Sequence, residues 1–303
     1  MFRPMSCRAG TRALNLAVRL APFRAGAQLV RRGAVPPLEA PRLGDPQRHH
    51  MTKHLAIVPA YNESGAIAST VADIHQHAPG FDVLVVDDGS TDATSQLARG
   101  AGAQVLRHPF NLGIGGAVQS GYQFALEHDY DVAIQVDGDG QHDARHIPEL
   151  LAELRSRPGL NLITGSRFLA TEDDGDGYRS SASRRLGIRL FARILSLIVG
   201  HRVTDPTSGF RMTDRRAIEL FARDYPHDYP EVEAVLMVHA HRLESIELPV
   251  RMRARQTGRS SINASQSAFY MVKVLLALFV GLLRARPVVQ PGDDAPVRAE
   301  HVL

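Results

Sequence analysis

The sequence predicts an α/β fold in which helices cover both faces of a central, mostly parallel sheet. From Lys53 onward, short β-branched apolar segments alternate with longer segments of helical periodicity. Strands and helices that alternate at this spacing form right-handed βαβ units, which build a parallel sheet. Polar motifs follow three of the predicted strands, and ligands of such folds gather at the carboxyl ends of the strands.

Five predicted strands precede residue 168, and each is short and largely apolar. They are "HLAIVPA" (54–60), "FDVLVVDD" (81–88), "AQVLRHP" (103–109), "DVAIQVD" (131–137) and "NLITGSR" (161–167). Capping residues and amphipathic spacing predict the helices that alternate with them, at 64–77, 91–99, 115–128 and 143–155.

The alternation loosens after residue 168. The segment 169–185 is acidic and rich in Gly and Ser, so we expect a solvated loop there. A helix is predicted at 186–199, a further helix follows "DPTSGFRM" (205–212), and a strand is predicted at 244–252. "RARQTGRSSI" (253–262) is then a basic, Ser-rich loop.

The basic character of the chain is confined to its beginning. Residues 1–50 contain nine Arg, no Lys, and only Glu39 and Asp45 as acids, a net charge of +7. Because the whole chain carries +3, the remaining 253 residues carry −4. A mildly acidic body excludes a broad nucleic-acid-binding surface. The only cysteine, Cys7, also lies in this first segment, which excludes disulfides and cysteine-ligated metals from the body.

We expect four regions along the chain. Residues 1–50 are predicted to be a disordered, Arg-rich extension with Met51 as the functional start, the alternative being an amphipathic transit peptide. A catalytic domain is expected over 51–264 and a disordered tail over 287–303.

Between them, residues 265–286 contain a segment (268–283) that is apolar except for Lys273. Its sixteen residues are fewer than the roughly 20 that a spanning helix needs. The flanking arginines favour a helix that lies in or dips into a membrane face near anionic lipid. A buried helix of the core is the alternative.

The motif "DGDGQH" follows the fourth predicted strand. Asp137 and Asp139 would repel each other unless a cation lies between them, and with Gln141 they offer the hard oxygen ligands of Mg²⁺ or Mn²⁺. An EF-hand is excluded because Gln141 and His142 stand where its loop needs an Asp or Asn and then a Gly.

The motif "DDGSTD" follows the second predicted strand. Asp87 or Asp88 could accept hydrogen bonds from ribose hydroxyls or a base, as acids do at this position of nucleotide-binding sheets. Alternatively, Asp88, Ser90 or Thr91 caps the next helix. A dehydrogenase fingerprint in "NLGIGGAVQSG" is excluded, because Val118 stands at its third glycine.

Seven motifs now give a family resemblance. "IVPAYNE", "VVDDGSTD", "NLGIGGA", "DGDGQHD", "GSRF", "DPTSGFR" and "RQTGRSSI", in this order over residues 53–262, resemble the family 2 inverting glycosyltransferases. The most similar branch is that of the dolichyl- and polyprenyl-phosphate sugar transferases. The resemblance implies the GT-A fold, with a Rossmann-like nucleotide-binding half.

The resemblance also implies roles for individual residues. The nucleotide of a UDP- or GDP-sugar would contact Pro59, Ala60, Tyr61, Glu63, Asp87, Asp88, Gly115 and Gly116. Asp137, Asp139 and Gln141 would hold Mg²⁺ or Mn²⁺ on the donor diphosphate, with Arg211 completing the catalytic set. Donor or acceptor phosphates would contact Arg167, Arg185, Arg255 and Ser260. The branch often has Lys where Ile114 or Gly115 stands, and Pro where Asp143 stands.

The implied reaction is an in-line displacement with inversion, in which the cation stabilises the departing diphosphate. A lipid-phosphate acceptor, with a second pKa near ~6, is already an anion and needs no general base. A hydroxyl acceptor in cell-wall or polysaccharide synthesis is the alternative, and it would need a base such as Asp205, Glu231 or Glu233.

Two further alternatives are an aspartyl phosphohydrolase, for which Gln141 is the wrong residue, and a non-catalytic membrane partner that binds sugar nucleotides. A processive polysaccharide synthase is excluded, because the chain has no Trp for its Q-x-x-R-W motif. The expected location is the cytoplasmic face of a membrane. A homo-oligomer or a small membrane-protein partner is left open.

Overall fold

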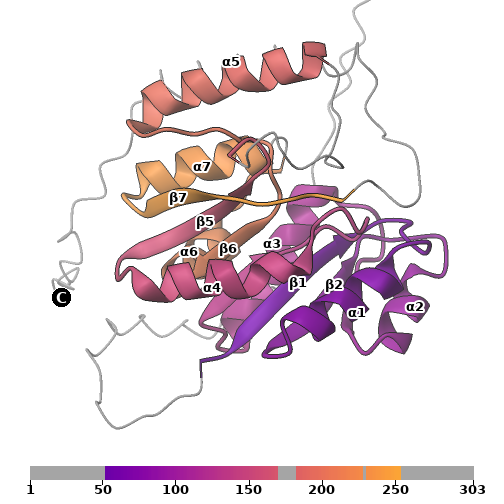
Figure 1. Cartoon of the computed structure of the whole chain (residues 1–303). Coiled ribbons are helices and arrows are strands. Elements are labelled where there is room, and N and C mark those ends of the chain that lie inside the picture. The colour runs from indigo at the N-terminus through magenta and orange to yellow at the C-terminus, as the bar shows by residue number, and fades with distance from the viewer. Residues whose placement is uncertain (1–51, 170–181, 228–229, 254–303) are drawn as a thin grey trace, which may run out of the picture. The chain divides into compact units, whose positions relative to one another are not determined.

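The computed structural model of the chain describes residues 52–169, 182–227 and 230–253, and the side chains of α5 from residue 191 onward (Figure 1). The predicted regions 1–50, 265–286 and 287–303 lie outside the described residues, so the division of the chain into four regions stays a prediction. Among the described helices, none combines the length and hydropathy that crossing a bilayer requires.

The described part of the chain contains a seven-stranded sheet in the order β3-β2-β1-β4-β6-β5-β7. The strands are β1 (His54–Ala60), β2 (Phe81–Asp87), β3 (Gln104–Arg107), β4 (Val132–Gln135), β5 (Leu160–Ser166), β6 (Arg211–Asp214) and β7 (Glu244–Pro249). Neighbouring strands are parallel except β6, which runs antiparallel to both β4 and β5. The predicted mostly parallel sheet is confirmed.

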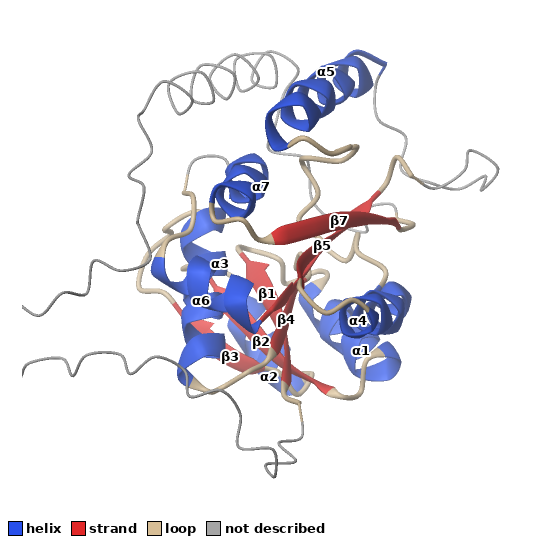
Figure 2. Ribbon diagram, turned by 90° about the vertical axis from the view of Figure 1, so that its left-hand side faces the viewer, coloured by secondary structure: helices blue, strands red, loops and turns tan. Residues whose placement is uncertain are grey.

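Helices cover both faces of this sheet, as predicted (Figure 2). The helices are α1 (Ile67–His77), α2 (Thr94–Gly100), α3 (Ile114–Glu127), the 3₁₀ turn η1 (Ala144–His146), α4 (Ile147–Ser156), α5 (Ala182–Val199), α6 (Arg215–Arg223) and α7 (Pro230–Ala240). Buried residues of α1, α2 and α4 pack against one face, and those of α3, α6 and α7 pack against the other. α5 packs on α7 through Phe191, Leu195 and Val235.

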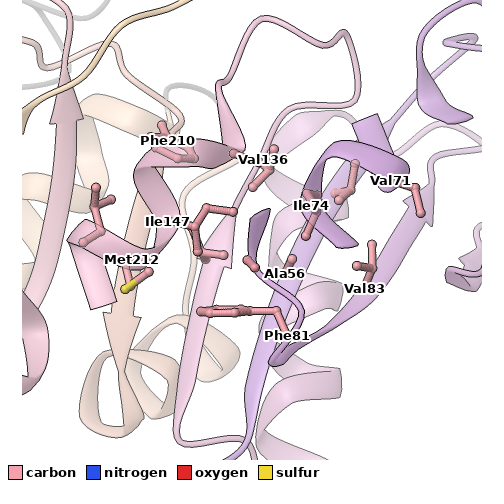
Figure 3. Packing of buried hydrophobic residues seen from close by; sticks show 14 of the residues in the cluster. Ala56, Val71, Ile74, Phe81, Val83, Val136, Ile147, Phe210 and Met212 are labelled. Atoms are coloured by element: carbon pink, nitrogen blue, oxygen red, sulfur yellow. The ribbon is translucent and has the colours of Figure 1, made fainter. Parts of the chain in front are cut away.

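The alternation of side chains along the strands divides the core into these two layers. Ala56 and Val83 point to the layer that holds Val71, Ile74 and Ile147 (Figure 3). Leu55, Ile57 and Leu84 point to the opposite layer, with Tyr122 and Phe221. Since both faces of β1 and β2 are buried, these strands read as continuous apolar runs in the sequence.

Two parts of the second half differ from the prediction. The segment after residue 205 contains the antiparallel strand β6, which was not predicted, and two helices follow it where one was expected. The short strand begins with Arg211 and ends with Asp214, so it shows no apolar alternation. Asp214 is at the same time the N-cap of α6, because its carboxylate accepts a hydrogen bond from Ala217 N at 2.9 Å.

Candidate active site at the carboxyl ends of the strands

The loops that follow β1 and β2 are hydrogen-bonded into one structure. Asn62, with a φ of 55°, donates from its backbone to Ser90 Oγ at 2.9 Å, and its side chain accepts from Thr91 N at 2.8 Å. Glu63 N donates to Thr94 Oγ1 at 2.9 Å. The adjacent and parallel β1 and β2 therefore bring the motifs "PAYNE" and "DDGSTD" together at one edge of the sheet.

Asp87 is buried at the end of β2 and its carboxylate is bound within the loop. It accepts hydrogen bonds from Ser90 N at 2.8 Å and from the Ser95 hydroxyl. Burial by itself would raise the pKa of Asp87, but the hydrogen bonds from Ser90 and Ser95 outweigh it, so the pKa lies below its ordinary value. Asp87 is therefore a carboxylate at neutral pH.

Asp88, also buried, holds the loop that precedes α3. Its carboxylate accepts hydrogen bonds from Leu112 N at 2.8 Å, from Gly113 N at 2.9 Å, and contacts His108 Nδ1 at 2.8 Å. The alternative that Asp88, Ser90 or Thr91 caps the next helix is wrong, because the N-cap of α2 is Ala93. Contact of either aspartate with a ribose stays a prediction.

Gly115 and Gly116 are buried at the beginning of α3. A Cβ at residue 115 would lie 2.4 Å from Pro226 O, and a Cβ at residue 116 would lie 2.8 Å from Leu112 Cβ. Close packing of the backbone therefore accounts for both glycines, and their contact with a nucleotide stays a prediction.

The "DGDGQH" motif lies beside the end of β1. Gly138 N donates to Pro59 O at 3.2 Å, and a Cβ at residue 138 would be 3.0 Å from that oxygen and 3.2 Å from Ala60 Cβ. Pro59 and Ala60, predicted to contact the nucleotide, are thus next to Asp137, predicted to bind the metal. Tyr61 is exposed beyond them and Glu63 is partly exposed.

Asp137 has a side chain that is 38% exposed although three neighbours contact it. Gln135 Nε2 donates to Asp137 Oδ1 at 3.2 Å, and His142 Nε2 lies 3.6 Å from Asp137 Oδ2. His142 Nδ1 accepts from Asp137 N at 2.9 Å, which places the ring proton on Nε2, facing the carboxylate. Gly209 lies against the same carboxylate, since a Cβ there would be 3.0 Å from Asp137 Oδ1.

Asp137, Asp139 and Gln141 fit a hard divalent cation by the chemistry of their donor set. Asp139 is partly buried, and its Oδ1 accepts from Gln141 N at 3.0 Å, so the three residues form one short loop. Among the described residues no group of three or more His, Cys, Asp or Glu side chains is placed to hold a metal. Two carboxylates and an amide oxygen suit Mg²⁺ or Mn²⁺, which are held by few carboxylates and keep several waters.

Arg211 is fully buried at the beginning of β6. Its guanidinium donates to three backbone carbonyls, those of Ser208 at 2.9 Å, Pro206 at 3.4 Å and Glu231 at 2.5 Å. Nη1 has no hydrogen-bond partner among the described residues. Burial raises the pKa of the Glu231 carboxyl, while the nearby charge of Arg211 opposes that rise. Arg211 thus fixes the 206–209 loop that contacts Asp137.

Arg167 is engaged by a fully buried aspartate. Its Nε and Nη2 donate to the two oxygens of Asp205 at 2.6 and 2.7 Å, and Nη2 also donates to Thr207 Oγ1 at 2.8 Å. Asp205 is therefore bound within the protein in this state. The side chain of Arg185, as well as Arg255 and Ser260, lie outside the described residues, so their phosphate contacts stay predictions.

Sequence reasoning missed Gln135 and Gly209 as supports of Asp137, whereas it considered His142 as a neighbour of the metal. Gln135 was visible as the one polar residue of an otherwise apolar strand, and His142 as part of the motif. No sequence pattern could indicate Gly209, because its contact with Asp137 arises only when β6 pairs with β4.

Comparison with known proteins identifies a family of glycosyltransferases. A family model described as glycosyl transferase family 2 matches residues 55–221. An undecaprenyl-phosphate mannosyltransferase of Micrococcus luteus is 30% identical over 69% of this chain and 87% of its own length. A polyprenol monophosphomannose synthase of Mycolicibacterium smegmatis is 29% identical over 78% of this chain and 91% of its own.

Among solved structures, a glucosyl-3-phosphoglycerate synthase of Mycobacterium tuberculosis, crystallised with Mn²⁺ and uridine diphosphate, matches with a TM-score of 0.56. It is 20% identical, and the match covers 76% of this chain and 80% of that one. This likeness concerns the fold, and the fold is GT-A.

Proposed function

The chain belongs to glycosyltransferase family 2, and from that premise we propose that it transfers a sugar from a UDP- or GDP-linked donor to a polyprenyl phosphate, with inversion at the anomeric carbon. The family itself rests on the match over residues 55–221. The choice of a lipid-phosphate acceptor is supported by relatives named as an undecaprenyl-phosphate mannosyltransferase and a polyprenol monophosphomannose synthase.

The observation that carries the proposal is the half-exposed carboxylate of Asp137 at the edge of the sheet where the loops of β1, β2 and β4 meet. Asp137, Asp139 and Gln141 would hold Mg²⁺ or Mn²⁺, which when bound supplies positive charge to the diphosphate that leaves. Gln135 and the Gly209 backbone orient Asp137 for that purpose.

The protein's own residues then bind the two phosphate-bearing substrates. The nucleotide would lie across the joined loops, against Pro59, Ala60 and Tyr61. Asp87 is buried beneath these loops, and its carboxylate holds the loop that follows β2 in place. Arg211 is fully buried, so it would act by fixing the 206–209 loop that contacts Asp137. Arg167, Arg185, Arg255 and Ser260 are proposed for the remaining phosphate contacts.

Geometry also favours a phosphate acceptor over a hydroxyl acceptor. A hydroxyl would have to give its proton to a base, and Asp205 is fully buried and bound by both nitrogens of the Arg167 fork. A phosphate needs no such base. Glu231 and Glu233 remain the candidate bases for the alternative hydroxyl acceptor, and burial raises the pKa of Glu231.

A lipid acceptor requires work at a membrane surface. We propose that the protein acts at the cytoplasmic face, where sugar nucleotides are available, with the apolar segment 268–283 and its flanking arginines as the contact with lipid.

In the test, purified protein is incubated with labelled UDP- or GDP-sugars, Mn²⁺ or Mg²⁺, and a polyprenyl phosphate. The label that reaches the organic phase is then measured. We expect metal-dependent transfer that Asp139→Ala reduces by at least about 100-fold, while Glu149→Ala on the exposed surface of α4 leaves it unchanged. If every donor gave only hydrolysis or no reaction while the protein still bound nucleotide, the lipid-phosphate acceptor would be rejected. A hydroxyl acceptor or a non-catalytic binding protein would then be favoured.

A further inference from the structure

The loop that carries the predicted metal ligands, residues 137–143 (the metal loop), is held from two sides. On one side lies α1, where Thr70 Oγ1 donates to Gly138 O at 3.4 Å and Asp73 Oδ2 accepts from Ala144 N at 3.1 Å. On the other side lies the chain that follows β7. Met252 pairs with His142 in an antiparallel bridge, and Arg253 N donates to Gln141 O at 2.8 Å.

The side chain of Arg253 joins these two sides. Its Nη1 and Nη2 donate to the two oxygens of Asp73 at 2.9 and 3.2 Å, and Nη2 also donates to Asp143 Oδ1 at 2.8 Å. Asp143 is buried, so water screens its charge-assisted bond with Arg253 less than it screens an exposed pair. The planar fork of arginine suits this arrangement, because it binds Asp73 through two nitrogens while Nη2 also reaches Asp143.

A second arginine contacts the same carboxylate and provides a comparison. Arg145 donates to both oxygens of Asp143, through Nε at 3.0 Å and Nη2 at 2.5 Å. Its side chain is 64% exposed, and its guanidinium donates to Asp143, two residues away in the sequence. Arg145 therefore stabilises a local turn, whereas Arg253 links the metal loop to α1 and to the chain after β7.

We propose that Arg253 is a positioning residue for the divalent cation, because through Asp73, Asp143 and Gln141 O it fixes the metal loop in the conformation that presents Asp137 and Asp139. This inference rests on the proposed metal-dependent function. Arg253 also directly precedes the basic segment 254–262, which carries Arg255 and Ser260. The same residue thus joins the metal loop to the segment proposed to contact phosphate.

The first test measures Mn²⁺ binding directly, by electron paramagnetic resonance of MnCl₂ titrated with the full chain in the presence of UDP or GDP. We expect Arg253→Gln to weaken Mn²⁺ binding by about tenfold, as the loss of a residue behind the ligands does, and Arg253→Lys to lie between it and the wild type. Arg145→Gln, which removes the same charge from the same carboxylate, should stay within about twofold of the wild type. Turnover of Arg253→Gln should recover at saturating Mn²⁺. The Mn²⁺ concentration for half-maximal turnover should therefore rise while kcat is kept.

The second test combines Arg253→Gln with Asp73→Asn. If both act through one link, the double variant binds Mn²⁺ no more weakly than Arg253→Gln alone. Circular dichroism will show whether Arg253→Gln folds. If it does not, Asp73→Asn and Arg253→Lys are used for the test instead. Equal Mn²⁺ affinity in the Arg253 and Arg145 variants would overturn the inference. A wild-type protein that binds nucleotide but no Mn²⁺ would overturn it together with the metal dependence of the proposed function.

Discussion

The neighbours of Asp137 show how single residues prepare a cation site. Gln135 donates to one oxygen of its carboxylate, His142 lies near the other, and the Gly209 backbone rests beside both. A carboxylate oriented in this way by its surroundings needs little rearrangement when a cation binds. Glycine at 209 matters here because any Cβ would occupy the space of the carboxylate.

Gly209→Ala should therefore weaken cation binding more than it weakens the fold. The new Cβ would lie 2.9 Å from Gln135 Nε2 and 3.0 Å from Asp137 Oδ1, so the partly exposed carboxylate has to move. We expect about a tenfold rise in the Mn²⁺ concentration for half-maximal transfer. Gly80→Ala is the matched control, because a Cβ there meets nothing within 4 Å. Equal Mn²⁺ dependence of the two variants would show that Gly209 does not shape the site.

Asp143 gives a pH dependence that can be measured without metal or substrate. Burial by itself would raise the pKa of Asp143, but hydrogen bonds from Arg145 and the charge of Arg253 lower it to about 2. A carboxyl whose pKa is near ~3.9 in the unfolded chain then stabilises the fold above that pH, and the stabilisation is lost as the pH falls toward 2.

Asp143→Asn should accordingly lower the free energy of unfolding by about 2 kcal/mol at pH 7. The difference in the free energy of unfolding between variant and wild type should shrink below about pH 5 and nearly vanish at pH 2. Urea denaturation with a chelator present measures it. If this difference in the free energy of unfolding stayed constant down to pH 2, Asp143 would stabilise the fold through its shape and not through its charge.

At the scale of elements, α3 lies close against β1 at Gly121. A Cβ on Gly121 would lie 2.2 Å from Ile57 Cγ2, so this glycine sets the distance at which α3 lies on the sheet. α3 also begins with the loop that Asp88 holds, and the helix thereby connects the packing of the core with the nucleotide side of the candidate site.

Gly121→Ala should destabilise the protein by about 2 kcal/mol, since the helix or Ile57 must shift to make room. Gly100→Ala in α2, where a Cβ meets nothing, is expected to be neutral or to stabilise by a few tenths of a kcal/mol up to about 1. Chemical denaturation decides between them. Adding Ile57→Ala to Gly121→Ala should cost less than Ile57→Ala costs in the wild type, and full additivity of the two would contradict the proposed contact.

The elements also show where the sequence was informative. The strands β1 and β2 were predicted to within a residue, because strands buried on both faces are continuous apolar runs. α1 begins at Ile67 rather than Ser64, since residues 62–64 donate their backbone N–H groups to the loop after β2. β6 could not be predicted, because its four residues are stabilised by pairing with β4 and β5. The local sequence carries no information about that pairing.

The same contrast holds for the candidate site. The pair Asp137 and Asp139 could be recognised from a local motif after an apolar strand, and the structure places it beside Pro59 and Ala60 as the predicted topology requires. The partners of Asp205 and Arg211 could not be predicted, because Arg167 and Glu231 come from distant segments of the chain.

At the scale of the whole molecule, the sheet gathers the site from motifs spread over more than 150 residues, from the loop of β1 to the loop before β6. Such a site joins both halves of the sheet, since Asp137 follows β4 while Gly209 precedes β6. Ligands that bridge these parts should stabilise the folded state as a unit.

A nucleoside diphosphate with Mn²⁺ should therefore raise the melting temperature of the entire domain. At about 100 times the dissociation constant, binding adds about 2.7 kcal/mol, which for a protein of this size corresponds to roughly 5–10 °C. We expect the full shift with only one of UDP and GDP, which would identify the donor base. Asp139→Asn should keep the part of the shift that nucleotide gives alone and lose the part that depends on Mn²⁺. A shift of the same size in wild type and Asp139→Asn would place the cation elsewhere, and no shift with either nucleotide would argue against a nucleotide-sugar donor altogether.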